Sequence, residues 1–259
     1  MIRRFKQWLA RHRRGNNKFL SCCIAVFDGV VQFLRVSWKL ITSGDTRSIY
    51  YNKFFNSKNI HQTTSSTCMD RYPEIFSACR DYFQEKHPPK ILSFGCATGE
   101  EVVTLCHYFP ESEIVGAEIN QNSLRRCREL KMDEKVRFIE STTENIAAQG
   151  PYDLIFCMAV LQRTPGTIED KQIRDLRKIY PFEKFQEKVV ELDGLLNTDG
   201  LFVIHMSQYD LPDTSIANRY RPYGDWNQAC YGPWFFGPDS KLKTSTAPRH
   251  SIFQKIQKA

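Results

Sequence analysis

The chain has 259 residues, of which 41% are hydrophobic and 25% are charged, close to ordinary globular usage. A chain of this length and composition can bury a sizeable core, which excludes intrinsic disorder for most of it. No stretch long enough to span a bilayer, about 18 apolar residues, is free of charges, so an ordinary transmembrane helix is not expected.

The net charge of +7 comes from one end of the chain. Residues 1–27 carry seven lysines and arginines and no acid, leaving 29 basic side chains to balance the 29 acidic ones elsewhere. A nucleic-acid groove would spread its basic residues over a folded face, so no nucleic acid is expected as a partner. A basic tail suits an anionic partner, most simply a lipid surface.

Residues 1–14 and 19–40 both show helical spacing of apolar side chains, with a break at 15–17. In the longer segment, polar residues share one face (Asp28, Gln32, Arg35, Lys39) and apolar residues the other (Ile24, Phe27, Val31, Leu34, Trp38). We therefore expect a basic amphipathic appendage over residues 1–45. Two interpretations are open: residues 1–41 lie on an anionic membrane surface, or the longer helix packs on the rest of the protein.

Nine cysteines occur, an odd number, and no two have Cys-x-x-Cys spacing. Several lie within apolar runs, which favours buried free thiols in a reducing compartment over disulfides or a metal site. The sequence therefore predicts a cytoplasmic protein, with peripheral membrane attachment as an option, and no bound metal.

From residue 89 onward the chain alternates strand and helix patterns. We expect strands at 90–94, 113–118, 136–140, 152–158 and 201–205, helices at 100–109, 123–131 and 182–196, and a closing antiparallel edge strand at 249–256. Such alternation predicts an α/β domain with a doubly wound, mostly parallel sheet over 89–259. Residues 46–88 would form a helical lid or cap.

The first strand runs into a glycine-rich turn, Gly95-Cys-Ala-Thr-Gly99, and Glu118 ends the second strand. A carboxylate at that position can accept hydrogen bonds from a ribose diol, which indicates an adenosine site. The glycine spacing differs from that of dinucleotide sites, and Glu100 and Glu101 would repel a pyrophosphate. A ligand with an ammonium and a sulfonium fits better.

These motifs together resemble those of class I S-adenosylmethionine-dependent methyltransferases. The resemblance covers ILSFGCATGEEV (91–102), IVGAEIN (114–120), YDLIFCMAVLQ (152–162) and LLNTDGLFVI (195–204). It implies a Rossmann-like, seven-stranded sheet, S-adenosylmethionine as cofactor and a methyltransferase activity.

Some details are similar to the chemotaxis-receptor methyltransferases, which esterify glutamate carboxylates. The run Gly-Cys-x-x-Gly-Glu-Glu stands here at 95–101, and Thr67-Cys-Met-Asp-Arg71 has the spacing of their upstream Thr-x-Phe-Phe-Arg motif without its phenylalanines. The N-terminal helical domain of that family is not recognisable.

The resemblance implies roles for individual residues. Gly95, Cys96 and Gly99 would line the methionine part, Glu101 would meet its ammonium and Arg71 its carboxylate. Glu118 would hold the ribose hydroxyls, Ile119 and Asn120 would flank the adenine, and Thr143 or Glu144 would reach its amino group. Met158 and Ala159 would lie near the methyl group. Arg71 could instead pair with Glu74 on a helix capped by Asp70, Thr143 and Glu144 could cap a turn, and Met158 could belong to the core.

Candidate residues for the acceptor side are sparse. His205 ends the fifth strand, and His61 lies in a polar segment before the first strand; either is a candidate catalytic base. Aromatic residues in the loop-like stretch 206–240 would suit a substrate pocket (Tyr209, Tyr220, Tyr223, Trp226, Tyr231, Trp234).

The sequence favours methyl transfer to a small-molecule, glycan or lipid-linked acceptor. A protein glutamate methyltransferase of the chemoreceptor type and a non-catalytic member that binds the cofactor or a partner protein are the alternatives, and a nicotinamide oxidoreductase is a more distant one.

Overall fold

The computed structural model describes residues 18–57, 59–62, 66–224, 234–244 and 249–257. The chain divides into two compact units, residues 1–50 and residues 51–259. The expected helix over residues 1–14 lies outside the described residues.

The N-terminal unit consists of the long helix α2 (Lys18–Thr42) and the first part of α3 (Gly44–Phe55). The helix expected at 19–40 is thus confirmed. At the turn that follows it, the Arg47 guanidinium donates hydrogen bonds to the Leu40 and Ile41 carbonyls, and Ser43 Oγ accepts one from the Thr46 N–H. These bonds satisfy groups that a helix end leaves unpaired. None of the helices in the described ranges is both long and apolar enough to cross a lipid bilayer.

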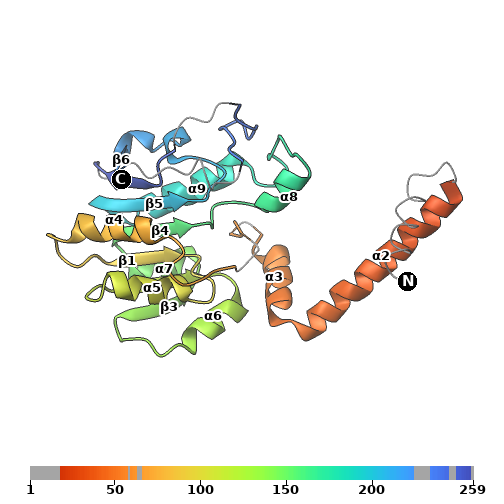
Figure 1. Cartoon of the computed structure of the whole chain (residues 1–259), viewed down its shortest axis with the longest axis horizontal. Coiled ribbons are helices and arrows are strands. Elements are labelled where there is room, and N and C mark those ends of the chain that lie inside the picture. Colours follow the sequence, from red (N-terminus) through yellow and green to blue (C-terminus); the bar gives the residue numbers. More distant parts are fainter. Residues whose placement is uncertain (1–17, 58, 63–65, 225–233, 245–248, 258–259) are drawn as a thin grey trace. The chain divides into compact units, whose positions relative to one another are not determined.

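A seven-stranded sheet forms the centre of the second unit, in the order β3-β2-β1-β4-β5-β7-β6 (Figure 1). Its strands are β1 (Ile91–Phe94), β2 (Ile114–Glu118), β3 (Val136–Glu140), β4 (Tyr152–Met158), β5 (Leu196–His205), β6 (Tyr220–Pro222) and β7 (Ile252–Lys255). Strands β1 to β5 pair in parallel, whereas β7 runs antiparallel to β5 and to β6. The predicted doubly wound, mostly parallel sheet is therefore confirmed.

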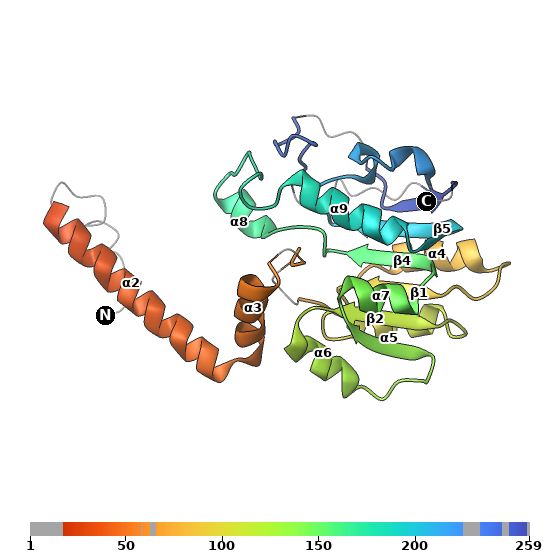
Figure 2. The ribbon, with the colours of Figure 1, turned by 180° about the vertical axis from the view of Figure 1, so that it is seen from behind.

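Helices cover both faces of the sheet, as Figures 1 and 2 show. One buried cluster includes side chains of α4 (Pro73–Phe83), α5 (Glu100–Tyr108) and α6 (Gln121–Arg128). The other includes side chains of α7 (Thr143–Gln149), α8 (Pro165–Asp170) and α9 (Phe182–Asp193). In β1, Ile91 belongs to the first cluster, and Leu92 and Phe94 belong to the second, as the period of a strand requires. Both faces of the central strands are thereby buried.

Three expectations about the C-terminal part need correction. The strand at 249–256 is not at the edge, because β6 pairs with its far side. The stretch 206–240 is not all loop: it contains β6 and the 3-10 turns η1 (Leu211–Asp213) and η2 (Ala217–Arg219). Strand β5 also begins five residues earlier than expected, at Leu196. A three-residue strand such as β6 is too short to show an alternating pattern.

Several aromatic residues proposed for a substrate pocket belong to the core instead. Tyr209 is fully buried and its hydroxyl donates to the Tyr180 carbonyl, while Tyr220 donates to the Asp193 carboxylate. Trp234 packs against the same core. Trp226 and Tyr231 lie outside the described residues.

Candidate functional site

The glycine-rich turn lies at the carboxyl end of β1, the strand flanked by β2 on one side and β4 on the other. Gly95 and Gly99 have φ values of +79° and +98°, which side chains other than glycine rarely adopt. A Cβ on Gly95 would lie 2.5 Å from Val160 Cγ2. The Gly95 and Cys96 N–H groups both donate to the Ala117 carbonyl, at 2.8 and 3.2 Å. In a doubly wound sheet, the crevice beside this point is where ligands bind.

Glu118 ends β2 beside this turn and is only 6% exposed. One carboxylate oxygen accepts a hydrogen bond from the Ala97 N–H at 2.8 Å, and the other accepts one from the Asn120 N–H at 2.7 Å. Burial raises the pKa of Glu118 to about 7, although these backbone donors act in the opposite direction. Each oxygen retains a lone pair that can accept another hydrogen bond.

Glu101 is a second carboxylate at the same turn. It lies in the first turn of α5 and accepts a hydrogen bond from Ser93 Oγ at 2.7 Å. Burial raises the pKa of Glu101 to about 7, with Ser93 and the Arg71 charge acting in the opposite direction. Neither carboxylate makes an ion pair with another described residue, so a cationic ligand would stabilise the ionised form of both.

Arg71 is exposed, and its guanidinium lies 5.2 Å from the centre of the Tyr72 ring and donates to the Ser66 carbonyl. Its charge influences both Glu101 and His205. The expected helix cap was wrong: Tyr72 precedes α4, and the Asp70 carboxylate instead accepts a hydrogen bond from the Tyr108 hydroxyl.

His205 ends β5 and is buried, with Nδ1 2.9 Å from Ser251 Oγ and its ring edge-on to Tyr72 at 4.8 Å. Burial lowers the pKa of His205 to about 4, and Arg71 adds to the effect. The imidazole is therefore neutral at pH 7, but such a low pKa makes it a weak proton acceptor.

His61 packs on the other core. Its Nδ1 lies 2.7 Å from the Tyr180 hydroxyl, and its ring meets those of Tyr180 and Phe94 edge-on. Burial lowers the pKa of His61 to about 3, and three nearby cations add to the effect. Because Phe94 and Tyr180 belong to one core and Tyr72 packs on the other, the structure does not bring His61 and His205 together.

The residues predicted to surround the adenine are already partly engaged. The Asn120 side chain caps α6 by accepting from the Asn122 and Ser123 N–H groups. Thr143 donates to the Glu191 carboxylate at 2.9 Å, and Glu144 is exposed. The suggestion that Thr143 or Glu144 caps the turn was wrong, because Thr142 caps α7.

Three further predicted residues lie at the ends of β1 and β4. The Cys96 thiol is buried in the core, where a hydrogen bond with Cys127 and burial raise its pKa, so only the Cys96 backbone remains to line a ligand. Met158 is also part of this core. Ala159 has a φ of +58°, and its N–H donates to the His205 carbonyl.

One contact near the site had no signal in the sequence. Asn52, in the last part of α3, is buried and donates through its side-chain amide to the Ile119 carbonyl at 2.9 Å. The two residues are 67 positions apart, and no local pattern indicates such a pairing.

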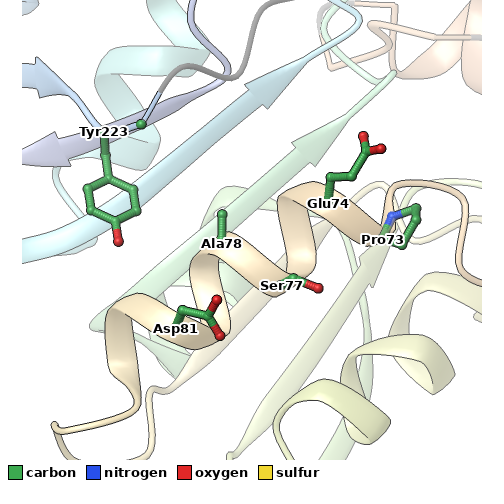
Figure 3. A pocket seen from close by; sticks show the side chains of 7 residues that line it. Pro73, Glu74, Ser77, Ala78, Asp81 and Tyr223 are labelled. Atoms are coloured by element: carbon green, nitrogen blue, oxygen red, sulfur yellow. The ribbon is translucent and has the colours of Figure 1, made fainter.

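A groove of about 600 Å³ runs along α4 (Figure 3). Tyr223 lies across from the helix, which contributes Pro73, Glu74, Ser77, Ala78 and Asp81. Tyr223 was predicted for a substrate pocket, whereas none of the residues predicted to bind the cofactor or to act as a base lines this groove. Among the described residues, no group of three or more His, Cys, Asp or Glu side chains is arranged to hold a metal ion.

The sheet order and the glycine-rich turn beside Glu118 are those of a Rossmann-like fold. Residues 92–181 match the family model described as a methyltransferase domain. The second unit therefore contains, over residues 92–181, a segment that matches a methyltransferase domain.

Comparison with other proteins gives partial matches. Trans-aconitate 2-methyltransferase of Rhodopseudomonas palustris (strain BisB5) is 30% identical over 82 residues, which cover 32% of this chain and 31% of the relative. An uncharacterized protein of Rickettsia prowazekii (strain Madrid E) is 23% identical over 158 residues, covering 58% and 56%. The match thus spans about a third of the first relative and little more than half of the second.

Among solved structures, the plantazolicin methyltransferase BpumL in complex with SAH is 16% identical. The match covers 64% of this chain and 55% of that one, with a TM-score of 0.37. A likeness with this score supports no conclusion about the chain. The assignment of a methyltransferase domain comes from the match over residues 92–181.

Proposed function

We propose that this protein transfers the methyl group of S-adenosylmethionine to a small-molecule or glycan acceptor, including one linked to a lipid. The supporting observation is the pair of carboxylates, Glu101 and Glu118, on either side of the Gly95–Gly99 turn. Both have a pKa of about 7 because of burial. Such groups are stabilised by a ligand that supplies a positive charge and hydroxyl donors, and S-adenosylmethionine carries both.

The residues present fit this cofactor. Glu101 would meet the ammonium, Arg71 the carboxylate and Glu118 the ribose hydroxyls, while the two glycines allow the backbone to approach closely. The bound cofactor supplies an electrophilic methyl group. The task of the chain is then to hold an acceptor in line with that group. His205 remains the candidate base, although its low pKa favours acceptors that are already nucleophilic, such as carboxylates.

Calorimetric titration of the full chain with S-adenosylmethionine tests the proposal, with NADH as comparator. Glu118→Ala should weaken binding about tenfold or more, because a hydrogen bond to a charged group contributes about 1.5–3 kcal/mol. Glu85→Ala, at an exposed position, is the matched control. Equal affinity of the wild type, Glu118→Ala and Glu85→Ala for S-adenosylmethionine would overturn the assignment of Glu118.

Transfer of a radiolabelled methyl group into small-molecule, glycan, lipid and protein fractions then identifies the acceptor. Label in protein alone would favour a glutamate methyltransferase of the chemoreceptor type.

We also propose that residues 1–41 bind an anionic membrane surface. On α2, apolar side chains at helical spacing are exposed within their own unit (Val26, Phe27, Val30, Phe33, Leu34, Trp38, Ile41). Arg35 and Lys39 lie on the opposite, polar side of the helix. Residues 1–27 carry seven lysines and arginines and no acid. Apolar burial at the interface and attraction to anionic headgroups act together in such helices.

Flotation with phosphatidylcholine vesicles, with and without phosphatidylglycerol, tests the membrane proposal. Binding should require the anionic lipid, fall with added salt and disappear when residues 1–41 are deleted. Phe33→Glu should reduce it strongly, whereas Gln32→Glu adds the same charge on the polar side and should change it little. Unchanged flotation after the deletion would contradict the proposal.

A further inference from the structure

Basic side chains gather beside the carboxyl ends of β1 and β4. Arg163 lies five residues beyond the end of β4. Lys184 and Lys188 are four residues apart on α9, which Figure 2 shows along one face of the sheet. The His61 ring lies among them, 6.4 Å from that of Phe94, the residue directly before the glycine turn. The charges of all three cations act on His61. These four residues, the basic cluster, therefore adjoin the cofactor site.

The charges of the basic cluster are only partly balanced. Lys188 pairs with Glu191 at 2.5 Å. Lys184 instead donates to the Ser57 carbonyl at 2.6 Å, and Arg163 makes long contacts of 3.4 and 3.3 Å with the Ile60 and His61 carbonyls. Within the described ranges, neither Lys184 nor Arg163 makes an ion pair. Glu187 influences Lys184 only at longer range. Half-buried cations that face one another without a carboxylate are stabilised when an anion binds.

His61 provides an independent sign of a missing ligand. It is 3% exposed, and its buried Nε2 has no hydrogen-bond partner in the part of the chain that the structure describes. A buried polar atom left unsatisfied is costly, and native structures retain few of them. If the Tyr180 hydroxyl donates to Nδ1, the neutral ring carries its proton on Nε2 and can donate it to an anion.

We propose that Arg163, Lys184 and His61 form a subsite that binds a carboxylate or phosphate group of the methyl acceptor. This inference rests on the proposed methyl transfer, and it narrows the acceptor to an anionic molecule. The subsite lies next to the turn that approaches the cofactor, so an acceptor held there by its anionic group can present a nearby nucleophilic atom to the methyl group.

Titration of the full chain with inorganic phosphate and with citrate, without cofactor and at constant ionic strength, tests the subsite. Lys184→Gln and His61→Phe should each weaken binding of the preferred anion about tenfold or more. Lys178→Gln removes the same charge from an exposed position and should bind as the wild type does. Whether phosphate or citrate binds more tightly distinguishes a phosphorylated acceptor from a carboxylic one.

A second readout follows from Lys184, whose pKa is lowered to about 8 by burial, Arg163 and Lys188. An anion beside it would raise this pKa, so anion binding near pH 8.5 should take up a proton. Calorimetry in buffers of different ionisation enthalpy should detect this uptake in the wild type and not in Lys184→Gln. No anion binding at millimolar concentration, or equal binding by Lys184→Gln and Lys178→Gln, would overturn the subsite. Titration of the same proteins with S-adenosylmethionine reports separately on the cofactor site.

Discussion

At the scale of single residues, the proposed binding of S-adenosylmethionine depends on the protonation state of Glu101. A carboxyl with a pKa of about 7 is half protonated near neutrality, and only its ionised form attracts an ammonium. Binding of S-adenosylmethionine would lower this pKa and release a proton. Affinity should therefore rise with pH up to about 7 and level off above it.

This pH dependence can be measured between pH 5.5 and 7.0, where an α-amino group with a pKa of about 7.7–8.0 stays protonated. Below the pKa, the affinity of the wild type should rise by up to about tenfold per pH unit for each proton released. Glu101→Gln should bind S-adenosylmethionine more weakly at pH 7, and its affinity should depend less steeply on pH. The pH dependence that remains would come from Glu118. A profile unchanged by Glu101→Gln would show that this carboxylate does not face the ammonium.

The sequence places Glu118 at the end of an apolar strand, where a charged residue needs a partner, and its contact with the ribose stays a prediction. The sequence could not indicate which partners the neighbouring side chains already have. The cap made by Asn120 and the bond from Thr143 to Glu191 depend on tertiary placement. Neither is visible in a local pattern. The same holds for Asn52, which reaches Ile119 from outside the matched motifs.

At the scale of elements, the turn between β1 and α5 depends on Gly95. Its φ of +79° disfavours any side chain, and Val160 occupies the space that a Cβ would need. Gly95→Ala should lower the free energy of unfolding by about 1–3 kcal/mol and weaken cofactor binding, because the turn would have to shift. Urea unfolding and calorimetric titration measure the two effects.

The expected loss in Gly95→Ala has two causes, the steric conflict with Val160 and the strain of the positive φ, and they can be separated. Val160→Ala added to Gly95→Ala removes the steric conflict and should recover part of the loss, while the strain of the positive φ remains. Gly166→Ala, in helix α8 where a Cβ meets nothing within 4 Å, is the control and should lower neither the free energy of unfolding nor the affinity for the cofactor. If Gly95→Ala behaved like Gly166→Ala, the turn would be more tolerant than its geometry indicates.

Strands β1 to β4 were predicted within one residue because each is a short apolar run bounded by turn residues. Helices α7 and α8 were not predicted, and with seven and six residues they are too short to show a helical period. Strand β6 was missed for the same reason. Its place outside β7 comes from pairing with a strand that begins 30 residues after it ends, beyond the reach of local patterns.

At the scale of the whole molecule, the end of the sheet is held by a buried network around Asp193, at the end of α9. Lys255 in β7 lies 3.0 Å from the Asp193 carboxylate, and its Nζ also donates to the Asp193 and Leu196 carbonyls. Arg219 and Tyr220 donate to the same carboxylate at 2.6 and 2.7 Å. Asp193 and Lys255 are each 1% exposed, so water cannot replace either partner.

Asp193→Asn should therefore be strongly destabilising, because it leaves the buried Lys255 charge without a counterion. Breaking a buried ion pair from one side costs about 3–5 kcal/mol, which urea unfolding of the full chain would detect. Asp175→Asn breaks the exposed pair with Arg177 and should cost less than about 1 kcal/mol. Adding Lys255→Met to Asp193→Asn removes the uncompensated charge and should recover part of the loss in the free energy of unfolding.

If Asp193→Asn lowered the free energy of unfolding no more than Asp175→Asn does, the network around Asp193 would not be what holds β6 and β7 against α9. The loss should appear in the absence of cofactor as well, because the network stabilises the sheet that carries the site and does not contact the predicted cofactor residues.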